Sequence, residues 1–433
     1  MTTFIGIDVG TSACRACAID AHADIVAEAR TDLPAPARNG ACVEQDPAVW
    51  WLALGETLDQ LSARFDTGQL QRLAIDATSA TVLLCDPQGQ PLTHALMYND
   101  ARATSQAEAI ARIAPANTAA QGASCALAKL LWLTENGFST AAAHALHQAD
   151  WIAGKLCGQI GISDYNNALK LGFDAEQKSW PQWLSKQLSQ LGVPRKLLPK
   201  VVAPGTPLGD ISTELAQRFG LPTSTGIIAG TTDSTASFMA TGAHNIGEAV
   251  TALGSTLVVK VIAEQPIFAA EYGVYSQPLV VDGQQRWLVG GASNSGGAVL
   301  RQHFSDEQLR SLSAQLKPDQ PTGLDYYPLP SVGERFPVND AQLAPRLDPR
   351  PEDDSVFFQG ILEGIANIEA QAYRLLTELG APYPASVRST GGGAKNVAWT
   401  QIRQRCLQTT MLDAEQTEAA FGAALLAISS HTH

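Results

Sequence analysis

The chain has 433 residues, of which 45% are hydrophobic and 16% charged, a composition typical of a compact globular protein. One hydrophobic core rarely serves a chain of this length, so we expect two domains. The 42 acidic and 29 basic residues give a net charge of −13, which argues against nucleic acid as a partner. We expect no membrane span, because no apolar run approaches about 18 residues, and no secretory signal.

The seven cysteines are odd in number and scattered along the chain. This pattern favours a reducing cytoplasm over a disulfide framework. Cys14 and Cys17 have the spacing of a redox or zinc pair, but both fall in an expected strand and no second ligand pair follows. We therefore predict no metal or redox site at these cysteines.

The N-terminal region is predicted to begin with a β-hairpin. Alternating residues indicate strands over 4–8 and 15–20, which the turn Gly10-Thr11-Ser12 joins, and a third strand over 25–29. Asp46-Pro47 then predicts the start of a helix, because aspartate caps helix N-termini and proline fits the first turn. The order is that of an antiparallel sheet followed by a covering helix.

Two later strands are predicted to end in small polar residues. The strand over 72–76 leads to Thr78 and Ser79, and the strand over 226–229 leads to a small-residue helix that contains Asp233. Small neighbours leave room for a ligand beside Asp233, so we treat Asp233 as a candidate for a site.

The second half of the chain is predicted to repeat the opening pattern of the first. After a stretch over 103–218 with a mostly helical pattern, strands over 248–253 and 257–262 flank the turn Gly254-Ser255-Thr256. This reproduces the opening order of strand, hydroxyl-rich turn and strand. Duplicated hairpins predict two related domains.

Both hydroxyl-rich turns suit a phosphate group. Glycine lets backbone N–H groups approach an anion closely, and the hydroxyls of Thr11, Ser12, Ser255 and Thr256 add donors. Ordinary hairpins use the same residues, so one turn alone is weak evidence. Neither turn has the Gly-Lys-Ser/Thr sequence of a Walker loop.

Two acids stand beside these turns. Asp8 ends the first strand, where its carboxylate could hold the water shell of a magnesium ion, although it could also simply cap the turn. Asp233 begins the small-residue helix, where it could accept a hydroxyl proton during phosphoryl transfer or cap the helix.

Gly391-Gly392-Gly393 interrupts the chain between a strand over 387–390 and a helix that starts near Val397. Three glycines cost conformational entropy, so we expect a flat group such as a purine to lie against this backbone. A tight strand-to-helix turn is the alternative. The loop over 290–297 has similar small residues.

Taken together, these motifs resemble the FGGY family of carbohydrate kinases, and they occur in the family's order over nearly the whole chain. The matching segments are 8–12, 44–47, 98–102, 124–136 with Lys129, 230–233, 253–256, 333–335, 391–396 and 418–424. Ala126 departs from the family pattern, which usually has Pro, Ser or Thr there.

The resemblance implies an α/β fold of two ribonuclease-H-like, actin-like domains with a ligand cleft between them. It places the sugar side in residues 1–240, joined by a C-terminal helix over 414–430, and the nucleotide side in 241–413. It also implies ATP and Mg²⁺ as cofactors and a small-molecule sugar as the substrate.

The resemblance further implies roles for individual residues. Asp233 corresponds to the catalytic base, which also contacts the sugar, and Asp8 to the residue that meets magnesium and substrate. The residues that contact the phosphate groups in the family correspond here to Gly10, Thr11, Ser12, Gly254, Ser255 and Thr256. Those that contact the rest of the nucleotide correspond to Gly297, Gly392, Gly393 and Asn396. Thr78 and Ser79 lie in the loop that contacts the sugar hydroxyls.

The segments 75–79, 163–172 and 324–329 resemble the compact D-ribulose kinases, which make D-ribulose 5-phosphate. Xylulose kinases commonly carry tryptophan at the position of Tyr98. Three alternatives stay open at this point: a D-xylulose kinase, an actin- or chaperone-like ATPase, and a sugar sensor without catalysis.

Overall fold

A computed structural model describes residues 2–115, 117–188, 190–281 and 284–429, and the chain divides into two compact units. The first unit comprises Met1–Ala240 and Glu418–His433, and the second comprises Thr241–Thr417. The predicted boundary at 413/414 thus falls four residues early. Residues just before Glu418 stay with the second unit because Glu415 packs against Gly242 and donates its N–H to the Thr241 carbonyl.

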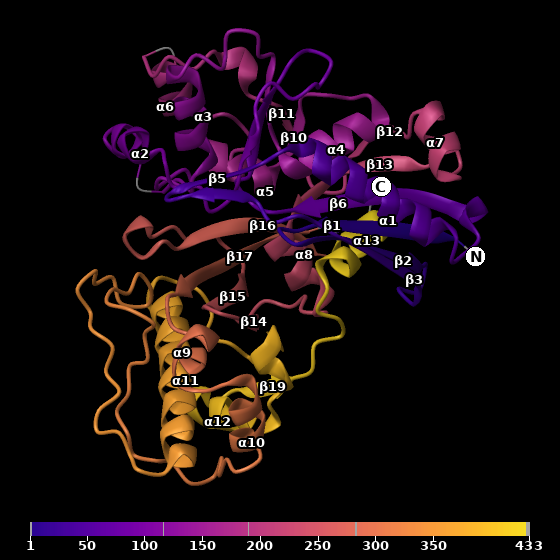
Figure 1. Cartoon of the computed structure of the whole chain (residues 1–433). Coiled ribbons are helices and arrows are strands. Elements are labelled where there is room, and N and C mark those ends of the chain that lie inside the picture. The colour runs from indigo at the N-terminus through magenta and orange to yellow at the C-terminus, as the bar shows by residue number, and fades with distance from the viewer. Residues whose placement is uncertain (1, 116, 189, 282–283, 430–433) are drawn as a thin grey trace. The chain divides into compact units, whose positions relative to one another are not determined.

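The first unit is built on a six-stranded sheet with the order β12-β13-β6-β1-β2-β3 (Figure 1). β1 pairs antiparallel with β2 and parallel with β6, and β6 pairs parallel with β13, as in a ribonuclease-H-like fold. The strands are β1 (Thr3–Val9), β2 (Ala13–Asp20), β3 (Ile25–Asp32), β6 (Leu70–Ala77), β12 (Pro207–Asp210) and β13 (Gly226–Thr232). The predicted strands are all present, each somewhat longer than predicted.

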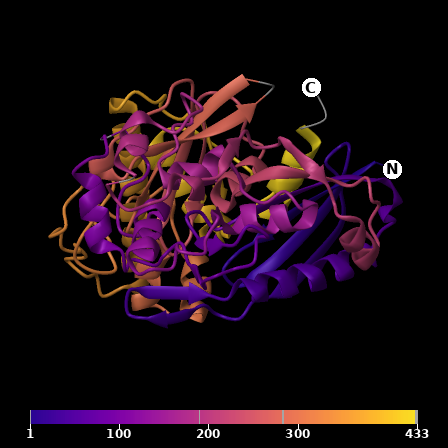
Figure 2. The ribbon, with the colours of Figure 1, turned by 90° about the horizontal axis from the view of Figure 1, so that it is seen from above.

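Helices cover both faces of this sheet. On one face, α1 (Pro47–Ser62), which runs beside the indigo strands in Figure 2, and α4 (Gln148–Cys157) bury Trp50 and Trp151 against alternate residues of β1 such as Ile7. On the other face lie α8 (Asp233–Ala240) and α13 (Ala419–Ser429). The predicted start of α1 is confirmed, since Asp46 accepts the Ala48 N–H at 2.9 Å.

Glycines allow α13 to pack directly onto the sheet. A Cβ on Gly6 would lie 1.9 Å from the Ala420 carbonyl oxygen, and a Cβ on Gly422 would lie 1.9 Å from that of Ala236. Only glycine fits at either position. The C-terminal helix was predicted over 414–430, but it starts at Ala419, and residue 430 lies outside the described residues.

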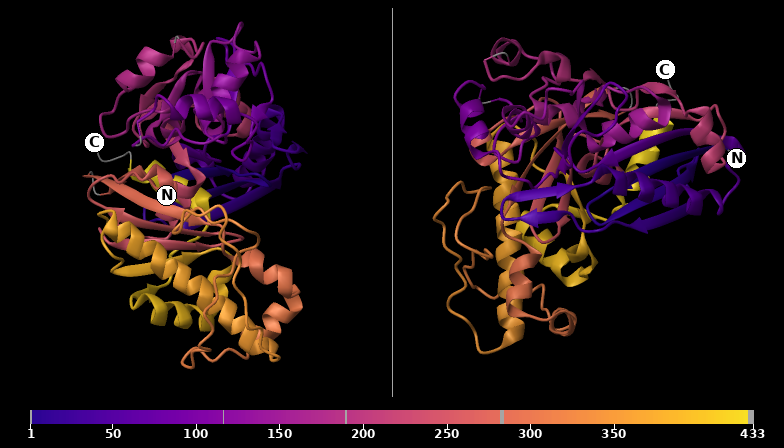
Figure 3. Two further views of the ribbon diagram at one scale, coloured as in Figure 1. Left: turned by 90° about the vertical axis from the view of Figure 1, so that its left-hand side faces the viewer. Right: turned by 45° about the horizontal axis from the view of Figure 1, so that its top comes forward.

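The sheet of the second unit has the order β16-β17-β15-β14-β18-β19, in which β17-β15-β14-β18-β19 corresponds to β3-β2-β1-β6-β13 of the first unit and β16 is an added edge strand. The long helix α11 (Asp354–Glu378) lies along this sheet together with α12 (Val397–Leu407) (Figure 3). The strands are β14 (Glu248–Leu253), β15 (Leu257–Ala263), β16 (Tyr275–Val281), β17 (Gln284–Ser293), β18 (Ser386–Thr390) and β19 (Thr410–Leu412). The shorter helices α9 (Gly297–His303) and α10 (Asp306–Ser313) precede α11. The predicted duplication is confirmed.

A buried ion pair joins these helices to the sheet. Glu369 on α11 and Arg403 on α12 are both fully buried and form two hydrogen bonds of 2.7 Å. Thr251 on β14 donates to Glu369 at 2.5 Å, and Arg403 donates to Ser389 on β18 at 2.6 Å. Two adjacent strands and two helices therefore share one network.

The rest of the first unit is less helical than its sequence pattern predicted. The stretch over 103–218 holds α2 (Thr104–Ala111), α3 (Ala126–Glu135), α4, α5 (Tyr165–Ala168), α6 (Gln182–Gln187) and α7 (Thr213–Phe219), but also β9 (His144–His147), β10 (Ile162–Asp164), β11 (Lys200–Val202) and β12. These strands have three or four residues, too few to show periodicity. β9 joins a small sheet with β4 (Ala37–Asn39), β5 (Cys42–Gln45), β7 (Val82–Cys85) and β8 (Ala95–Leu96). In the described residues, no helix has the length and apolar character for a membrane crossing.

Candidate functional site

Three carboxyl groups of the first unit meet at one end of its sheet. Asp8 and Asp76 are direct partners in the parallel ladder of β1 and β6, so their side chains share a face, and Thr231 of β13 pairs with Asp76. Asp233 follows two residues later, and its charge acts on Asp76. We call Asp8, Asp76 and Asp233 the acid cluster.

The acid cluster holds little compensating positive charge. Arg15 donates to the Asp8 carboxylate at 3.0 Å, yet burial still raises the pKa of Asp8. Burial and the neighbouring charges of Asp8 and Asp233 hold the pKa of Asp76 well above its usual range. A protonated Asp76 shares a side-chain hydrogen bond with Asp8, and no other donor contacts its oxygens in the part of the chain that the structure describes. A cluster of this kind accommodates a proton or a cation.

Asp76 was missed as a site residue in the sequence. The available signal was that two predicted strands, 4–8 and 72–76, both end in aspartate. In the structure these two strands are paired, and Asp8 and Asp76 lie directly opposite each other.

Asp233 stands at the first residue of α8 and is only partly buried. Its carboxylate accepts the Ser234 N–H at 2.7 Å. The neighbouring Thr232 and Thr235 hydroxyls bond to each other at 3.0 Å. The carboxylate is thus positioned by the helix start while it stays partly accessible.

The turn Gly10-Thr11-Ser12 lies beside Asp8, between β1 and β2. The Gly10 N–H is bonded to the Ala13 carbonyl at 3.0 Å. A Cβ on Gly10 would come no closer than 3.5 Å to any other group, so protein packing does not require glycine here. Ser12 is exposed and Thr11 partly so, which leaves their hydroxyls accessible.

Many buried polar atoms of the first unit lie in a few segments near the strand ends. Among the described residues, these atoms contact neither solvent nor a hydrogen-bond partner. Such groups cost roughly 1–3 kcal/mol each unless a ligand or water satisfies them. The residues are Ser79, Asn99, His147, Gln148, Ser163 and Asn167. Hydroxyl groups of a polyol would satisfy both the donors and the acceptors in this set.

The two predicted sugar-loop residues differ in their environment. Thr78 bonds to the Gln148 Oε1 atom at 2.8 Å and to the Thr81 hydroxyl at 2.6 Å, so it mainly positions Gln148. The Ser79 hydroxyl is one of the buried polar atoms without a hydrogen-bond partner among the described residues. Gln148 was missed, since an isolated glutamine at a helix start carries no sequence signal.

The second unit contains a cavity of about 880 Å³, a size that suits a nucleotide or a drug-sized ligand. It lies at the carboxyl ends of β14 and β18, between these strands and helices α9 to α12. The predicted residues that line it are Gly254, Ser255, Gly297, Gly392, Gly393 and Asn396. The structure therefore brings these six together, whereas Thr256 is exposed and does not line the cavity.

The glycine triplet is explained largely by the protein itself. Gly391 has a φ of +82°, and a Cβ there would lie 2.7 Å from the Leu253 carbonyl oxygen. A Cβ on Gly393 would lie 2.4 Å from the Trp399 ring. Only Gly392 faces open space. The expectation that a ligand must press against all three glycines is thus replaced by tight packing at two of them.

Asn396 has structural partners of its own. Its Oδ1 atom accepts the Trp399 N–H at 3.0 Å and so caps α12, while its Nδ2 atom donates to the Ser313 hydroxyl of α10 at 3.0 Å. Asn396 therefore joins two walls of the cavity. The contribution of α10 was not predicted.

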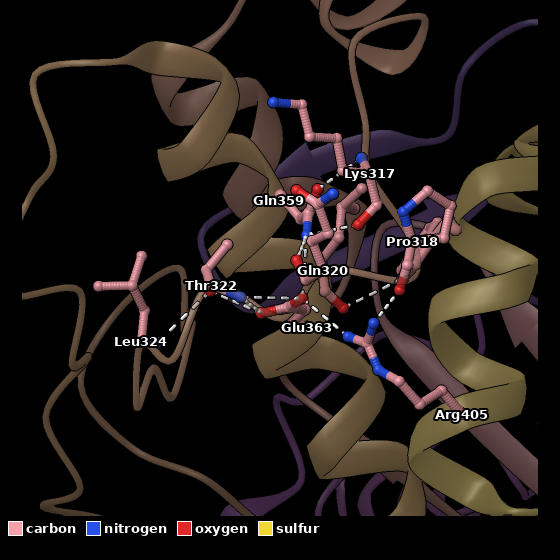
Figure 4. Close-up of polar contacts among 10 residues, drawn as sticks. Lys317, Pro318, Gln320, Thr322, Leu324, Gln359, Glu363 and Arg405 are labelled. Carbon is pink, nitrogen blue, oxygen red and sulfur yellow. Dashed lines mark hydrogen bonds and ion pairs between the residues drawn. The ribbon is translucent and has the colours of Figure 1, made fainter.

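Leu316 and Pro318 line a third wall of the cavity. The polar network in Figure 4 anchors the segment that carries them. Gln359 accepts the Lys317 N–H at 2.8 Å, and Arg405 bonds to both the Pro318 carbonyl and, at 2.8 Å, Glu363. Gln359 and Glu363 belong to α11, and Arg405 belongs to α12. These contacts therefore fix the loop segment 316–318 to both helices.

The residues present fit a magnesium ion held mainly by water and phosphate. Among the described residues, no group of three or more His, Cys, Asp or Glu side chains could cage a metal. Mg²⁺ is commonly bound through one or two carboxylates, which Asp8 and Asp76 can supply. Cys14 and Cys17 are free and buried, and burial raises the pKa of each to about 12, which argues against a metal or redox role.

Comparison with known proteins matches both units to family models. Residues 3–240 match the N-terminal domain, and residues 249–431 the C-terminal domain, of the FGGY family of carbohydrate kinases. The chain is 23% identical to a xylulose kinase of Staphylococcus xylosus, over 99% of this chain and 90% of that one. It is 22% identical to a gluconokinase of Bacillus subtilis, over 99% and 88% of the two chains.

Solved structures share the fold. A ligand-bound xylulose kinase from Lactobacillus acidophilus superposes with a TM-score of 0.86 at 20% identity, over 99% of this chain and 89% of that one. A glycerol kinase from Plasmodium falciparum, solved with ADP, gives 0.87 at 18% identity, over 99% and 90%. Since family models cover both units almost completely, the chain belongs to the FGGY family of carbohydrate kinases.

Proposed function

We propose that this protein uses ATP and Mg²⁺ to phosphorylate a ketopentose, D-ribulose, to D-ribulose 5-phosphate. The observation that carries the proposal is the acid cluster, which lies at the sheet end near buried polar groups that lack partners. An open-chain pentulose offers several hydroxyls to such groups, and the cluster offers a base beside them. The seven free cysteines support a cytoplasmic setting.

Asp233 is the proposed catalytic base. Its partly accessible carboxylate would accept the proton of the terminal sugar hydroxyl as that oxygen attacks the γ-phosphorus of ATP. Asp8, with Asp76 beside it, would hold the magnesium ion through its water shell. Bound there, Mg²⁺ would neutralise charge on the phosphate oxygens.

The turns supply the proposed phosphate contacts. With only 29 basic residues in the chain, the backbone N–H groups and hydroxyls of Thr11, Ser12 and Ser255 are suitable donors, while Gly10 and Gly254 allow a close approach to the backbone. The 880 Å³ cavity would hold the adenosine, with Gly392 as the glycine that leaves room for it.

D-xylulose is the second candidate, because several relatives are xylulose kinases. The segment with Thr78 and Ser79, and Tyr98 in place of tryptophan, favour D-ribulose. The relatives also include a gluconokinase, so gluconate belongs in any substrate panel.

A coupled assay of ADP release tests the proposal. The panel contains D-ribulose, D-xylulose, L-ribulose, gluconate and glycerol, each at several concentrations, with a no-sugar control. We expect the highest kcat/KM for D-ribulose. A higher value for D-xylulose would replace the proposed substrate, and ADP release that no sugar stimulates would favour an ATPase of the actin or chaperone kind.

A variant tests the base. We expect Asp233→Ala to lower kcat by about 10²- to 10⁴-fold, because general-base catalysis contributes that much. Nucleotide affinity should persist, since the proposed adenosine cavity lies in the other unit. Turnover at the wild-type level would refute the assignment.

A further inference from the structure

Lys129 is a buried cation in an apolar environment. It lies on α3 and is fully buried among Ala80, Leu127 and Leu130, which belong to one hydrophobic cluster. In the part of the chain that the structure describes, no carboxylate lies within ion-pair distance of its ammonium group. Burial lowers the pKa of Lys129 to about 7. Burying such a group is costly unless hydrogen bonds compensate for the lost water, so its backbone contacts need an explanation.

The ammonium group joins two loops by hydrogen bonds to their backbones. It donates to the Ala80 carbonyl at 2.7 Å and to the Met97 carbonyl at 2.8 Å. Ala80 has a φ of +68°, a conformation that is unfavourable for alanine and needs support from its surroundings. Lys129 supplies such support.

A second contact joins the same two loops. The Thr81 hydroxyl accepts the Tyr98 N–H at 3.0 Å and lies 2.6 Å from the Thr78 hydroxyl. Lys129 and Thr81 therefore fix the segment 78–81 against the segment 97–99 from two sides.

Each of the two segments contains a buried polar atom without a hydrogen-bond partner. The Ser79 hydroxyl and the Asn99 Oδ1 atom are shielded from solvent and have no hydrogen-bond partner among the described residues. Lys129 donates to the carbonyls of Ala80 and Met97. Ser79 directly precedes Ala80, and Asn99 follows Met97 by two residues. A shift of either loop would therefore move these two atoms.

We propose that Lys129 is a positioning residue for sugar recognition, which holds the loops that carry Ser79 and Asn99 in the geometry that binds sugar hydroxyls. This inference rests on the proposed function. Lys129 itself touches neither the sugar nor the phosphate; it acts through the Ala80 and Met97 carbonyls.

Kinetics of Lys129→Met in the full-length enzyme test the proposal, because methionine keeps the length and apolar stem while it removes the donors. We expect the KM for D-ribulose, or for the best sugar of the panel, to rise about 10-fold or more, and the KM for ATP to stay within about twofold. The melting temperature should fall moderately, because the buried Ala80 and Met97 carbonyls lose their shared donor. The matched control is Leu131→Ala, a cavity-forming change in the same helix and cluster. It should lower the melting temperature and leave the sugar KM unchanged.

Thr81→Val provides an independent test, because it removes the other contact between the loops. It should raise the sugar KM in the same direction, and the double variant should show less than the product of the two single effects. An unchanged sugar KM in Lys129→Met would overturn the proposal while the kinase function stands. So would a Lys129→Met protein that fails to fold, because the ammonium would then serve the fold itself. A wild-type enzyme that uses no sugar would overturn both.

Discussion

Asp164 offers a direct measurement of what a buried acid near the site costs the fold. It caps α5, where its Oδ1 atom accepts the N–H groups of Asn166 and Asn167 at 2.8 and 3.1 Å. It is fully buried, and burial together with the charge of Asp150 raises its pKa to about 7. The replacement Asp164→Asn keeps a side-chain oxygen for the cap and removes the titrating proton.

Asparagine can also satisfy the remaining contact. In the wild type, the Asn167 amide donates to the Asp164 Oδ2 atom at 2.6 Å, and the Asn167 Oδ1 atom has no partner among the described residues. Rotation of the Asn167 amide would let it accept from the new asparagine. The Asn167 amide nitrogen would then occupy the buried place where its Oδ1 atom now has no partner, so one amide group stays unsatisfied there in both proteins.

The magnitude follows from the two pKa values of Asp164. The unfolded carboxyl titrates near 3.8 and the folded one near 7. Between these values the folded state binds more protons than the unfolded state, so the free energy of unfolding falls as pH rises from about 4 to about 7 and then levels off. At about 1.4 kcal/mol for each pKa unit, the loss is at most about 4 kcal/mol.

Urea unfolding at pH values from 4.5 to 8.5, followed by tryptophan fluorescence, measures this loss. Six of the eight tryptophans lie in the first unit, so the signal reports mainly on the unit that contains Asp164. Asp164→Asn should match the wild type near pH 4.5 and become more stable towards pH 8. The matched control is Asp46→Asn, which changes an exposed aspartate cap at α1 and should give no such trend. A stability difference that is constant with pH would refute the reasoning.

Four further changes test separate parts of the structure. Gln148→Met removes the buried Nε2 group that we assign to a sugar hydroxyl, and initial rates should give a sugar KM about 10-fold or more above the wild type with an unchanged ATP KM; an unchanged sugar KM would contradict the assignment. Gly392→Leu places a side chain in the open part of the cavity, so nucleotide titration should show about 10-fold or more weaker binding while the melting temperature holds. Gly391→Ala should instead lower the melting temperature, because its φ is +82° and a Cβ would meet Leu253. Glu369→Ala should lower the free energy of unfolding by about 3–5 kcal/mol in urea, since it strands the buried Arg403 charge; a loss below 1 kcal/mol would contradict a closed network.

Local patterns in the sequence predicted much of the fold. Alternation of apolar residues placed β1, β2, β6 and β14, and the Asp46-Pro47 signal placed the start of α1. These features depend on neighbours within a few residues, so a single sequence contains them. The three- or four-residue strands β9 to β11 could not be found in this way, because their existence depends on partners far along the chain.

Register explains why Asp76 was missed. Asp8 and Asp76 are 68 positions apart, and only the parallel pairing of β1 with β6 makes them neighbours. The same applies to Gln148, which becomes a candidate only when Thr78 is seen to bond to it. Site residues that depend on long-range register are not encoded in local motifs.

The glycines show a different limit. A glycine in the sequence says that a Cβ is excluded, but not whether a ligand or the protein excludes it. At Gly6, Gly391 and Gly393 the excluding group is the protein, and at Gly392 no group lies within 4 Å. Only the coordinates separate these cases, and they reduce a three-residue motif to one position that a ligand could require.

Both units place their candidate residues at the same point of the same topology, with opposite chemistry. In the first unit, Asp8 and Asp76 are the last residues but one of the parallel strands β1 and β6. In the second unit, Gly254 and Gly391 directly follow the parallel strands β14 and β18. The carboxyl ends of parallel strands are open to ligands in both, but acids support proton transfer while glycines admit a bulky ring. Substitutions of Asp233 or of the sugar loop should therefore change kcat and the sugar KM, whereas substitutions that line the cavity of the second unit should change the ATP KM.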